Sequence, residues 1–232
     1  MKIALLGHGA MGRVLEETAR AAGLEVGAIV TSANAADASR LLRGHTVAID
    51  FSAPGGVLAH VEAAVAAGVP LVQGTTGWQR EEPEVRKIVD ARGGSLVYGA
   101  NFSIGVNLFY RLVASAARLF RRSHGYDPFI EEAHHARKRD APSGTALALR
   151  SILMRELAVE TVAIASTRAG SIPGTHRVGF DSAADQVLLV HTAHSRTGFA
   201  AGALLAASWI AGGTRRGMHA FSDVLDDILE VT

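Results

Sequence analysis

The glycine-rich run Gly7-His8-Gly9-Ala10-Met11-Gly12 constrains the fold of this chain more than any other feature, because it has the form G-x-G-x-x-G. It follows a short apolar stretch, residues 2–6, that is typical of a strand. It precedes residues 11–22, whose apolar spacing is helical. In this context the glycines allow a tight turn, close approach of a pyrophosphate and close packing of the helix on the strand. The run therefore predicts a dinucleotide-binding site, and a glycine-rich turn without a ligand is the alternative.

The residues that follow continue the alternation of strands and helices. We expect further strands at 24–30, 47–51, 69–73 and 95–98, and helices at 57–67 and 83–91. Short strands that alternate with helices predict a parallel sheet with helices on both faces, as in a Rossmann-like α/β domain.

The pattern changes near Asn101 and predicts a second, α+β domain with a mixed or antiparallel sheet. Its expected elements are a helix at 104–122, an extended segment at 128–134, a helix at 144–157, strands at 161–167 and 186–193 separated by a glycine-containing loop, a helix at 199–211 and a short terminal helix at 218–229.

The composition is globular, with 48% hydrophobic and 6% aromatic residues in a chain of 232. The 23 basic and 22 acidic residues nearly balance, which gives no sign of a nucleic-acid partner. The absence of cysteine excludes disulfides, thiolate nucleophiles and cysteine-based metal sites. No apolar run approaches the roughly 20 residues that span a bilayer, and the apolar start is too short for a signal peptide. We therefore expect a cytoplasmic protein with no membrane partner.

Two turns at the ends of expected strands bear on the cofactor. The turn after 24–30, where NAD-binding chains carry an acidic residue for the ribose, has Thr31 and Ser32 instead, and Arg40 and Arg43 follow nearby. This pattern leaves NADH and NADPH open. Gly74-Thr75-Thr76-Gly77 follows 69–73, at a strand end where ligands bind in open α/β sheets. This turn could lie against a flat ring of a ligand, or it could be an ordinary polar loop.

The run from Glu131 to Thr145 carries the clearest chemistry. Pro142 is placed to start a helix, so the N–H groups near Ser143, Gly144 and Thr145 lack intrahelical partners. Free N–H groups and the helix dipole at such a start favour a carboxylate or a phosphate. The run predicts an anion site at this helix start.

Cationic and titratable side chains precede that helix start. They are His134, His135, Arg137, Lys138 and Arg139. A histidine and a lysine can both move protons. Clustered cations would lower the pKa of the lysine, and a nearby carboxylate would raise that of the histidine. The three consecutive cations could instead be a solvated run or a nucleic-acid patch, but the run is short and is followed by Asp140. The two histidines could bind a metal, but adjacent residues on a strand point to opposite faces, so we expect no metal site.

The run Glu132-Ala133-His134-His135, followed by Lys138-Arg139-Asp140-Ala141-Pro142-Ser143-Gly144-Thr145-Ala146, closely resembles the signature of the 4-hydroxy-tetrahydrodipicolinate (dihydrodipicolinate) reductase family of lysine biosynthesis. The resemblance extends over nearly the whole chain. Other similar segments are 7–12, 74–77, 99–107, 168–170, 174–176 and 218–225.

The resemblance implies an NAD(P)H-dependent oxidoreductase that reduces 4-hydroxy-tetrahydrodipicolinate to (S)-tetrahydrodipicolinate in the diaminopimelate route. It implies a dinucleotide-binding domain at 1–101, joined by 206–232, and a substrate-binding and oligomerisation domain at 102–205. A homotetramer assembled through the sheet of the second domain is usual in the family.

The resemblance also assigns roles to residues. His134 and Lys138 match the family's proton-transfer residues. His135, Ser143, Gly144 and Thr145 match its substrate-binding residues. The expected cofactor contacts are Gly7, His8, Gly9, Ala10, Met11, Gly12, Thr31, Gly74, Thr75, Thr76, Gly99, Ala100, Asn101 and Phe102.

This chain departs from the family at positions that bear on the cofactor. Ala10 stands where many members have arginine or lysine, Thr31-Ser32 stands where many have Glu-Arg, and the stretch 31–47 is short. Two other functions remain as alternatives. One is another nicotinamide enzyme on the same scaffold, and the other is a nucleotide-sensing module without catalysis, which would not need His134 and Lys138.

Overall fold

The computed structural model describes residues 1–123 and 125–229. The chain divides into two compact units. The first comprises Met1–Ile104 and the segment from Arg196 onward, and the second comprises Gly105–Ser195. The boundary expected between 205 and 206 would divide a helix, α7 (Thr197–Ile210), that belongs whole to the first unit.

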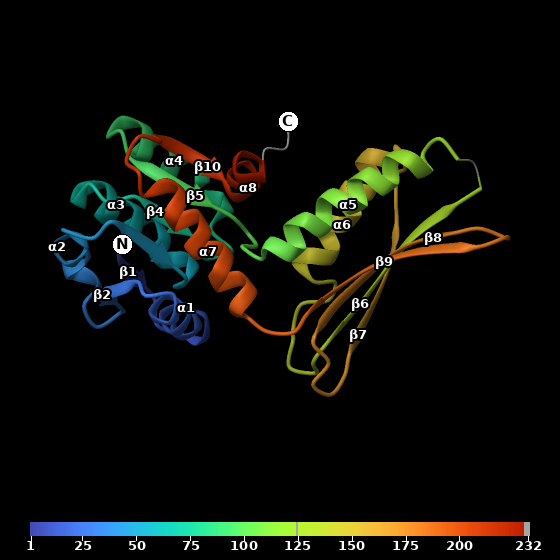
Figure 1. Ribbon diagram of the computed structural model, residues 1–232, viewed down its shortest axis with the longest axis horizontal. Helices are drawn as coiled ribbons and strands as arrows, with labels where there is room; N and C mark the ends of the chain where they lie inside the picture. Colours follow the sequence, from blue (N-terminus) through green and yellow to red (C-terminus); the bar gives the residue numbers. More distant parts are fainter. Residues whose placement is uncertain (124, 230–232) are drawn as a thin grey trace. The chain divides into compact units, whose positions relative to one another are not determined.

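The first unit is built on a six-stranded parallel sheet, which confirms the Rossmann-like architecture (Figure 1). Its strand order is β10-β5-β4-β3-β1-β2. The strands are β1 (Lys2–Leu6), β2 (Glu25–Val30), β3 (Val47–Asp50), β4 (Leu71–Gln73), β5 (Ser95–Tyr98) and β10 (Gly217–Ala220).

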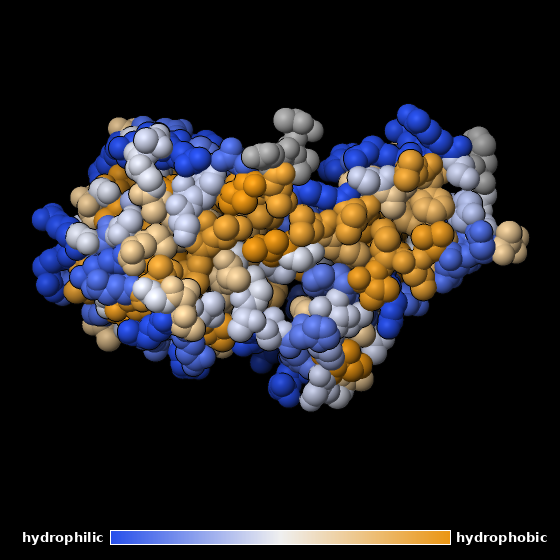
Figure 2. Space-filling view, in the orientation of Figure 1, coloured by the Kyte–Doolittle hydropathy of each residue, from blue (hydrophilic) through white to orange (hydrophobic). Residues whose placement is uncertain are grey.

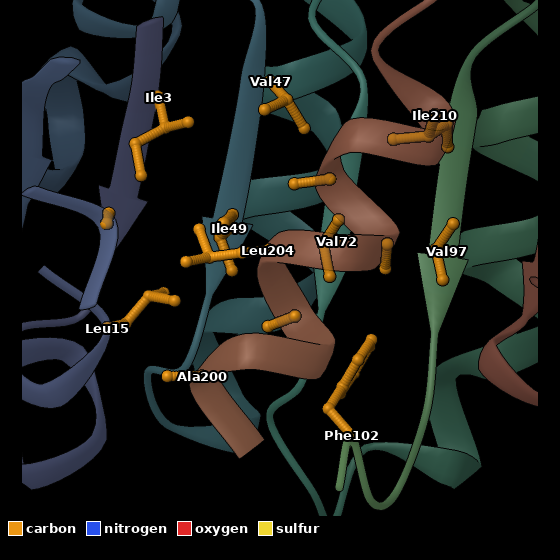
Figure 3. Packing of buried hydrophobic residues seen from close by; sticks show 14 of the residues in the cluster. Ile3, Leu15, Val47, Ile49, Val72, Val97, Phe102, Ala200, Leu204 and Ile210 are labelled. Carbon is orange, nitrogen blue, oxygen red and sulfur yellow. The ribbon is translucent and has the colours of Figure 1, made fainter. Parts of the chain in front are cut away.

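Helices cover both faces of this sheet because alternate strand residues point to opposite sides. Ile3 and Leu5 belong to one apolar cluster, with α1 (Ala10–Ala21), α7 and α8 (Phe221–Leu229). Figure 3 shows Ala200, Leu204 and Ile210 of α7 packed over Ile49, Val72 and Val97 of the strands. Ala4 and Leu6 belong to a second cluster, with the helices of the other face. Those helices are α2 (Ala38–Leu42), α3 (Val57–Ala67) and α4 (Glu82–Ala91), and short 3-10 turns lie at Ala35–Asp37, Pro54–Gly56 and Gln79–Glu81.

The terminal helix expected at 218–229 is wrong in its first turn. Residues 217–220 form β10, which pairs in parallel with β5, and the helix begins only at Phe221. Four residues are too few to show a strand period, and the pairing partner lies more than a hundred residues away in the sequence.

The second unit packs two helices on a four-stranded sheet. The helices are α5 (Ile104–Phe120) and α6 (Gly144–Leu157), and the strands are β6 (Asp127–His134), β7 (Ala163–Arg168), β8 (Gly174–Asp181) and β9 (Gln186–Ala193). The strand order is β7-β6-β8-β9, with β6 and β7 parallel and the other pairs antiparallel, so the sheet is mixed. Phe109, Val113, Leu149 and Leu153 of the helices share a core with Ile130, Val178 and Phe180 of the strands.

The glycine-containing loop expected between the strands of this unit is wrong, because its middle, Gly174–Asp181, forms β8 in the interior of the sheet. Gly174 and Gly179 argue for a loop when only the sequence is read. Gly179 is required for another reason. A Cβ at this position would overlap the ring of Phe129 on the adjacent strand. Glycine here permits close side-chain packing within a strand.

Among the described residues, no helix combines the length and apolar character needed to cross a membrane.

Candidate active site

The glycine turn of the first unit has the shape that a pyrophosphate requires. Gly7 has a φ of +88°, and a Cβ there would lie 2.7 Å from the carbonyl oxygen of Phe51. A Cβ at Gly12 would overlap the carbonyl oxygen of Gly7. A Cβ at Gly9, the N-cap of α1, would meet nothing within 4 Å. Gly7 and Gly12 therefore shape the turn, while Gly9 leaves the helix start open to a phosphate group.

The loop after β2 is held by its own hydrogen bonds. The Thr31 N–H donates to Asn34 Oδ1 at 2.7 Å, and Asn34 Nδ2 donates to the carbonyl oxygen of Ile29 at 3.1 Å. Arg40, one of the two nearby cations, pairs with Asp37 at 3.2 Å. Both side chains of this pair are exposed, so the pairing is weak and does not decide between NADH and NADPH.

A buried polar network joins the ends of β3 and β4. Asp50, which has no solvent exposure, accepts from His60 Nδ1 at 2.8 Å and from Gln73 Nε2 at 3.0 Å. It also accepts from the Thr75 hydroxyl at 3.2 Å and from the Ser52 N–H at 2.8 Å. The network fixes the start of the Gly74–Gly77 loop. Because the Thr75 hydroxyl is used inside the protein, Thr76 is the hydroxyl of this loop that faces solvent.

The segment after β5 combines exposed and buried positions. The Gly99 N–H donates to the carbonyl oxygen of Gln73 at 3.2 Å, which ties this turn to the end of β4. Ala100 is exposed, but Phe102 is 1% exposed and packs against Phe221 with ring centroids 4.6 Å apart. The Phe102 side chain therefore belongs to the core.

In the second unit, Glu132 of β6 lies at the centre of the residues that the sequence singled out. Its side chain has no exposure, and Oε1 accepts from the Ser143 N–H at 2.9 Å, the Ser166 hydroxyl at 2.7 Å and Arg168 Nη2 at 2.8 Å. Burial alone would raise the pKa of this carboxyl, but the hydrogen bonds from Ser143, Arg168 and Ser166 outweigh burial and lower the pKa to about 2. Glu132 is therefore a permanent anion inside the unit.

His134 follows Glu132 on the same face of β6, because residues two apart on a strand share a face. Its Nδ1 lies 3.4 Å from Glu132 Oε2, and the rings of His134 and His176 have centroids 5.1 Å apart. Burial lowers the pKa of His134, Glu132 raises it, and the charges of Lys138 and Arg168 lower it. The sequence-based expectation that a carboxylate raises this pKa was incomplete, because burial outweighs the carboxylate.

Lys138 lies in the loop that connects β6 to α6. Its ammonium group pairs with Asp140 Oδ1 at 2.9 Å, and a quarter of its side chain is exposed. Its charge is close enough to His134 to lower the pKa of the histidine. The structure thus brings His134 and Lys138 into one electrostatic environment. His135, one residue past the end of β6, is half-buried, and its Nδ1 has no hydrogen-bond partner within 1–123 and 125–229.

The start of α6 keeps two of the three N–H groups expected to be free. Ser143 is the N-cap, and its hydroxyl accepts from the Ala146 N–H at 3.2 Å. Its own N–H is donated to Glu132, so that group is already satisfied. The N–H groups of Gly144 and Thr145 remain for an anion, and a Cβ at Gly144 would meet open space. The Thr145 hydroxyl bonds with Tyr110, whose pKa burial raises.

Sequence reasoning missed the roles of Glu132, Ser166, Arg168 and His176. A signal was present for Glu132, which alternates with Ile130 and His134 on the buried face of β6. The other three lie on β7 and β8, and strand pairing places them beside Glu132. Glu132, His134 and His176 offer ligand atoms within 4.8 Å of one another. The Arg168 guanidinium on Glu132 would repel a metal ion there.

Comparison with known proteins identifies the family. The family described as "Dihydrodipicolinate reductase, N-terminus" matches residues 1–102, and "Dihydrodipicolinate reductase, C-terminus" matches residues 105–225. The curated 4-hydroxy-tetrahydrodipicolinate reductase of Christiangramia forsetii is 34% identical over 99% of this chain and 100% of its own length. That of Chromobacterium violaceum is 37% identical over 79% of this chain and 74% of its own.

Solved structures share the fold. A dipicolinate-bound dihydrodipicolinate reductase from Paenisporosarcina sp. TG-14 superposes with a TM-score of 0.78 and 19% identity, over 95% of this chain and 97% of its own. An amine dehydrogenase from Mycobacterium smegmatis superposes with a TM-score of 0.63 and 9% identity, over 96% of this chain and 95% of its own. The chain belongs to the dihydrodipicolinate reductase family, the NAD(P)H-dependent oxidoreductases of lysine biosynthesis whose curated members are 4-hydroxy-tetrahydrodipicolinate reductases.

Proposed function

We propose that this chain reduces 4-hydroxy-tetrahydrodipicolinate to (S)-tetrahydrodipicolinate with the residue roles set out above. The observation that carries the proposal is the second unit's grouping of two proton-transfer side chains, His134 and Lys138, with a helix start that keeps free N–H groups at Gly144 and Thr145. A cyclic dicarboxylate needs both a carboxylate site and a proton source.

The first unit would hold the cofactor. Gly7–Gly12 would receive the pyrophosphate at the start of α1, and Gly9 offers the open approach that this requires. The Gly74–Gly77 loop and the turn at Gly99–Asn101, which are tied together through Gln73, would contact the nicotinamide side. When bound, the reduced nicotinamide supplies a hydride.

The second unit would hold the substrate and supply the proton. His135, Gly144 and Thr145 would bind a substrate carboxylate, with Ser143 setting the geometry of the helix start. His134 or Lys138 would deliver a proton to the substrate, a contribution typically worth about 10²–10⁴-fold in rate. His134→Ala and Lys138→Ala should each depress kcat by a factor in that range while the protein stays folded.

One assay tests the activity and the cofactor together. The substrate is generated in situ by the synthase that precedes this step, and the loss of reduced-nicotinamide absorbance is followed separately with NADH and NADPH. Turnover that depends on the synthase supports the proposal. Turnover only with other substrates in a panel of sugars and amino acids would support a different dehydrogenase on this scaffold. Nucleotide binding without any turnover would support a sensing module.

Dipicolinate provides a second test. The relative from Paenisporosarcina was solved with dipicolinate bound. A planar dicarboxylate of this kind should inhibit this chain in competition with the substrate, and Thr145→Val should weaken the inhibition. For the assembly we propose a homotetramer formed through the sheet of the second unit, and for the location the cytoplasm, which cell fractionation would check.

A further inference from the structure

Two buried polar atoms of the second unit face each other without a hydrogen bond. Glu132 Oε2 and His134 Nδ1 are 3.4 Å apart, which exceeds an ordinary N–H···O distance, and among the described residues neither has another hydrogen-bond partner. A buried polar group without a hydrogen bond destabilises the protein, because it has lost its bonds to water. The arrangement would be satisfied if His134 carried a proton on Nδ1 and moved slightly toward the carboxylate.

We propose that Glu132 is a positioning residue for proton transfer, which accepts the Nδ1–H of protonated His134 at Oε2 and so directs the transferable proton to Nε2. This inference rests on the proposed function, in which His134 transfers a proton to the substrate. Glu132 acts through His134 and does not itself touch the substrate.

Hydrogen bonds to one oxygen fix the orientation of the Glu132 carboxylate. All three donors to Glu132 bind Oε1, and they come from β7 and from the N-cap of α6. Oε2 is thereby left to face the imidazoles. Because the pKa of Glu132 is lowered to about 2, the group stays ionised throughout the range in which an enzyme works.

His176 is the other imidazole near Oε2, and it does not compete as a cation. Its Nε2 lies 3.6 Å from Glu132 Oε2 but 3.1 Å from the Ser143 hydroxyl. Burial and the neighbouring His134 lower its pKa to about 4, so His176 is neutral near neutral pH. The carboxylate is therefore available to His134 when that ring becomes charged.

Gly174 leaves room beside Nε2, the ring nitrogen of His134 that does not face Glu132. A Cβ at Gly174 would lie 3.2 Å from His134 Nε2, so a larger residue would crowd the atom that carries the transferable proton. In the reaction the Nε2–H bond breaks, the proton passes to the substrate, and neutral His134 keeps its Nδ1–H on Glu132. Solvent water then returns a proton to Nε2.

Charges on several elements set the pKa of His134. Burial lowers this pKa most, and the charged groups that act on it are Glu132 of β6, Lys138 and Asp140 of the following loop, and Arg168 of β7. The ring of neutral His176, on β8, also faces His134. Glu132 and Asp140 raise the pKa, and Lys138 and Arg168 lower it. Removal of the Glu132 charge should therefore lower the pKa of His134. An acid catalyst works only while protonated, so the alkaline decline of kcat should move to lower pH.

The test is Glu132→Gln, which keeps the shape of the side chain and an oxygen for the three donors. We expect kcat to fall about 10²-fold, the lower end of what a positioned general acid contributes, with KM changed little and the alkaline limb of the kcat profile shifted to lower pH. In the free protein, ring-nitrogen NMR shifts of His134, assigned with His134→Asn, should change from the Nδ1–H to the Nε2–H tautomer. Glu132→Asp, which retains the charge, should recover part of kcat.

Glu131→Gln is the matched control. It removes the same charge from the adjacent position of β6, where the side chain is half exposed on the opposite face and pairs with Arg177 at 3.7 Å. It should leave kcat, the pH profile and the His134 tautomer unchanged, with sedimentation confirming that both variants keep the wild-type assembly. Wild-type kcat and an unchanged tautomer in Glu132→Gln would overturn the inference. An inactive wild-type enzyme would instead overturn the proposed function, and the NMR measurement would still decide the role of Glu132.

Discussion

The three glycines of the first turn belong to one motif but have different surroundings. Gly12 has no room for a side chain because the Gly7 carbonyl oxygen occupies that position. Gly9 has room, and its φ of −75° suits any residue. A side chain at Gly9 would therefore be limited only by a ligand that approaches the turn.

We expect Gly9→Ala and Gly12→Ala to separate folding from nucleotide binding. Gly9→Ala should change the free energy of unfolding by no more than about 1 kcal/mol and weaken NADH or NADPH binding about tenfold, or about 1.4 kcal/mol. Gly12→Ala should lower the free energy of unfolding by about 1–3 kcal/mol through overpacking. Chemical denaturation and calorimetric titration measure the two quantities. Unaltered nucleotide affinity in Gly9→Ala would contradict the placement of the pyrophosphate.

At this scale the sequence predicts local chemistry better than long-range contacts. His134, Lys138 and the helix start at Gly144 lie within one short run, so their proximity could be expected from the chain alone. Arg168 and His176 approach Glu132 only because β7 and β8 pair with β6 on either side. No spacing rule predicts a contact that depends on strand register.

Among the elements, those with strong local signals were predicted with accurate bounds. The α3 helix ends at Gly68, which has a φ of +69°, and α6 begins after its serine cap. Both signals act within one turn of the helix. The strand β10 was missed because it pairs with β5, which lies far away in the sequence. The strand β8 was missed because its glycines resemble those of a loop, although Gly179 serves packing within the sheet.

The hydrogen bond between α3 and the end of β3 gives a prediction about these two elements. His60 of α3 is the ring partner of buried Asp50, which also holds the Gly74–Gly77 loop through Thr75. His60→Leu should lower the free energy of unfolding by about 3–5 kcal/mol, as for other buried charges that lose a partner, and should raise the KM for the cofactor. Denaturant titration and steady-state kinetics measure these effects.

Glu62→Gln controls for a change of charge on the same helix, since Glu62 is exposed. It should leave both quantities unchanged. Wild-type stability in His60→Leu would show that Gln73 and the backbone suffice to hold Asp50.

For the whole molecule, acid should act on stability in two successive ranges. His176 has its pKa lowered to about 4 in the folded state, so it binds a proton more readily when the chain is unfolded. Stability is therefore lost as pH falls from about 6.5 toward 4. Glu132, with its pKa lowered to about 2, adds a further loss as pH falls below about 4.5.

The variant His176→Gln should reduce the slope of unfolding free energy against pH between about 4 and 6.5. A single proton contributes at most about 1.4 kcal/mol per pH unit, and His134 and His191, whose pKa values burial also lowers, retain part of the slope. Denaturation midpoints measured across this range test the prediction. A slope equal to that of the wild type would mean that folding does not lower the pKa of His176.

Among the described residues of the second unit, β9 and α5 each have an exposed apolar surface that could form the interface of the proposed tetramer. On β9, Leu188 is 46% and Val190 54% exposed, and both point away from the helices because they alternate with Leu189, which packs in the core. On α5, Leu112 is 61% and Leu119 73% exposed, and Figure 2 shows apolar side chains gathered over this helix. Either surface could bury apolar area in an assembly.

The proposed assembly through the sheet of the second unit predicts that Val190→Asp should dissociate the assembly while Leu112→Asp should not. A charge buried without a partner in an interface costs several kcal/mol, and each 1.4 kcal/mol weakens association tenfold, so micromolar protein should show smaller species in sedimentation velocity. Dissociation by Leu112→Asp alone would assign the interface to α5. A wild-type monomer would remove the tetramer from the proposal, and the residue roles would then have to operate within one chain.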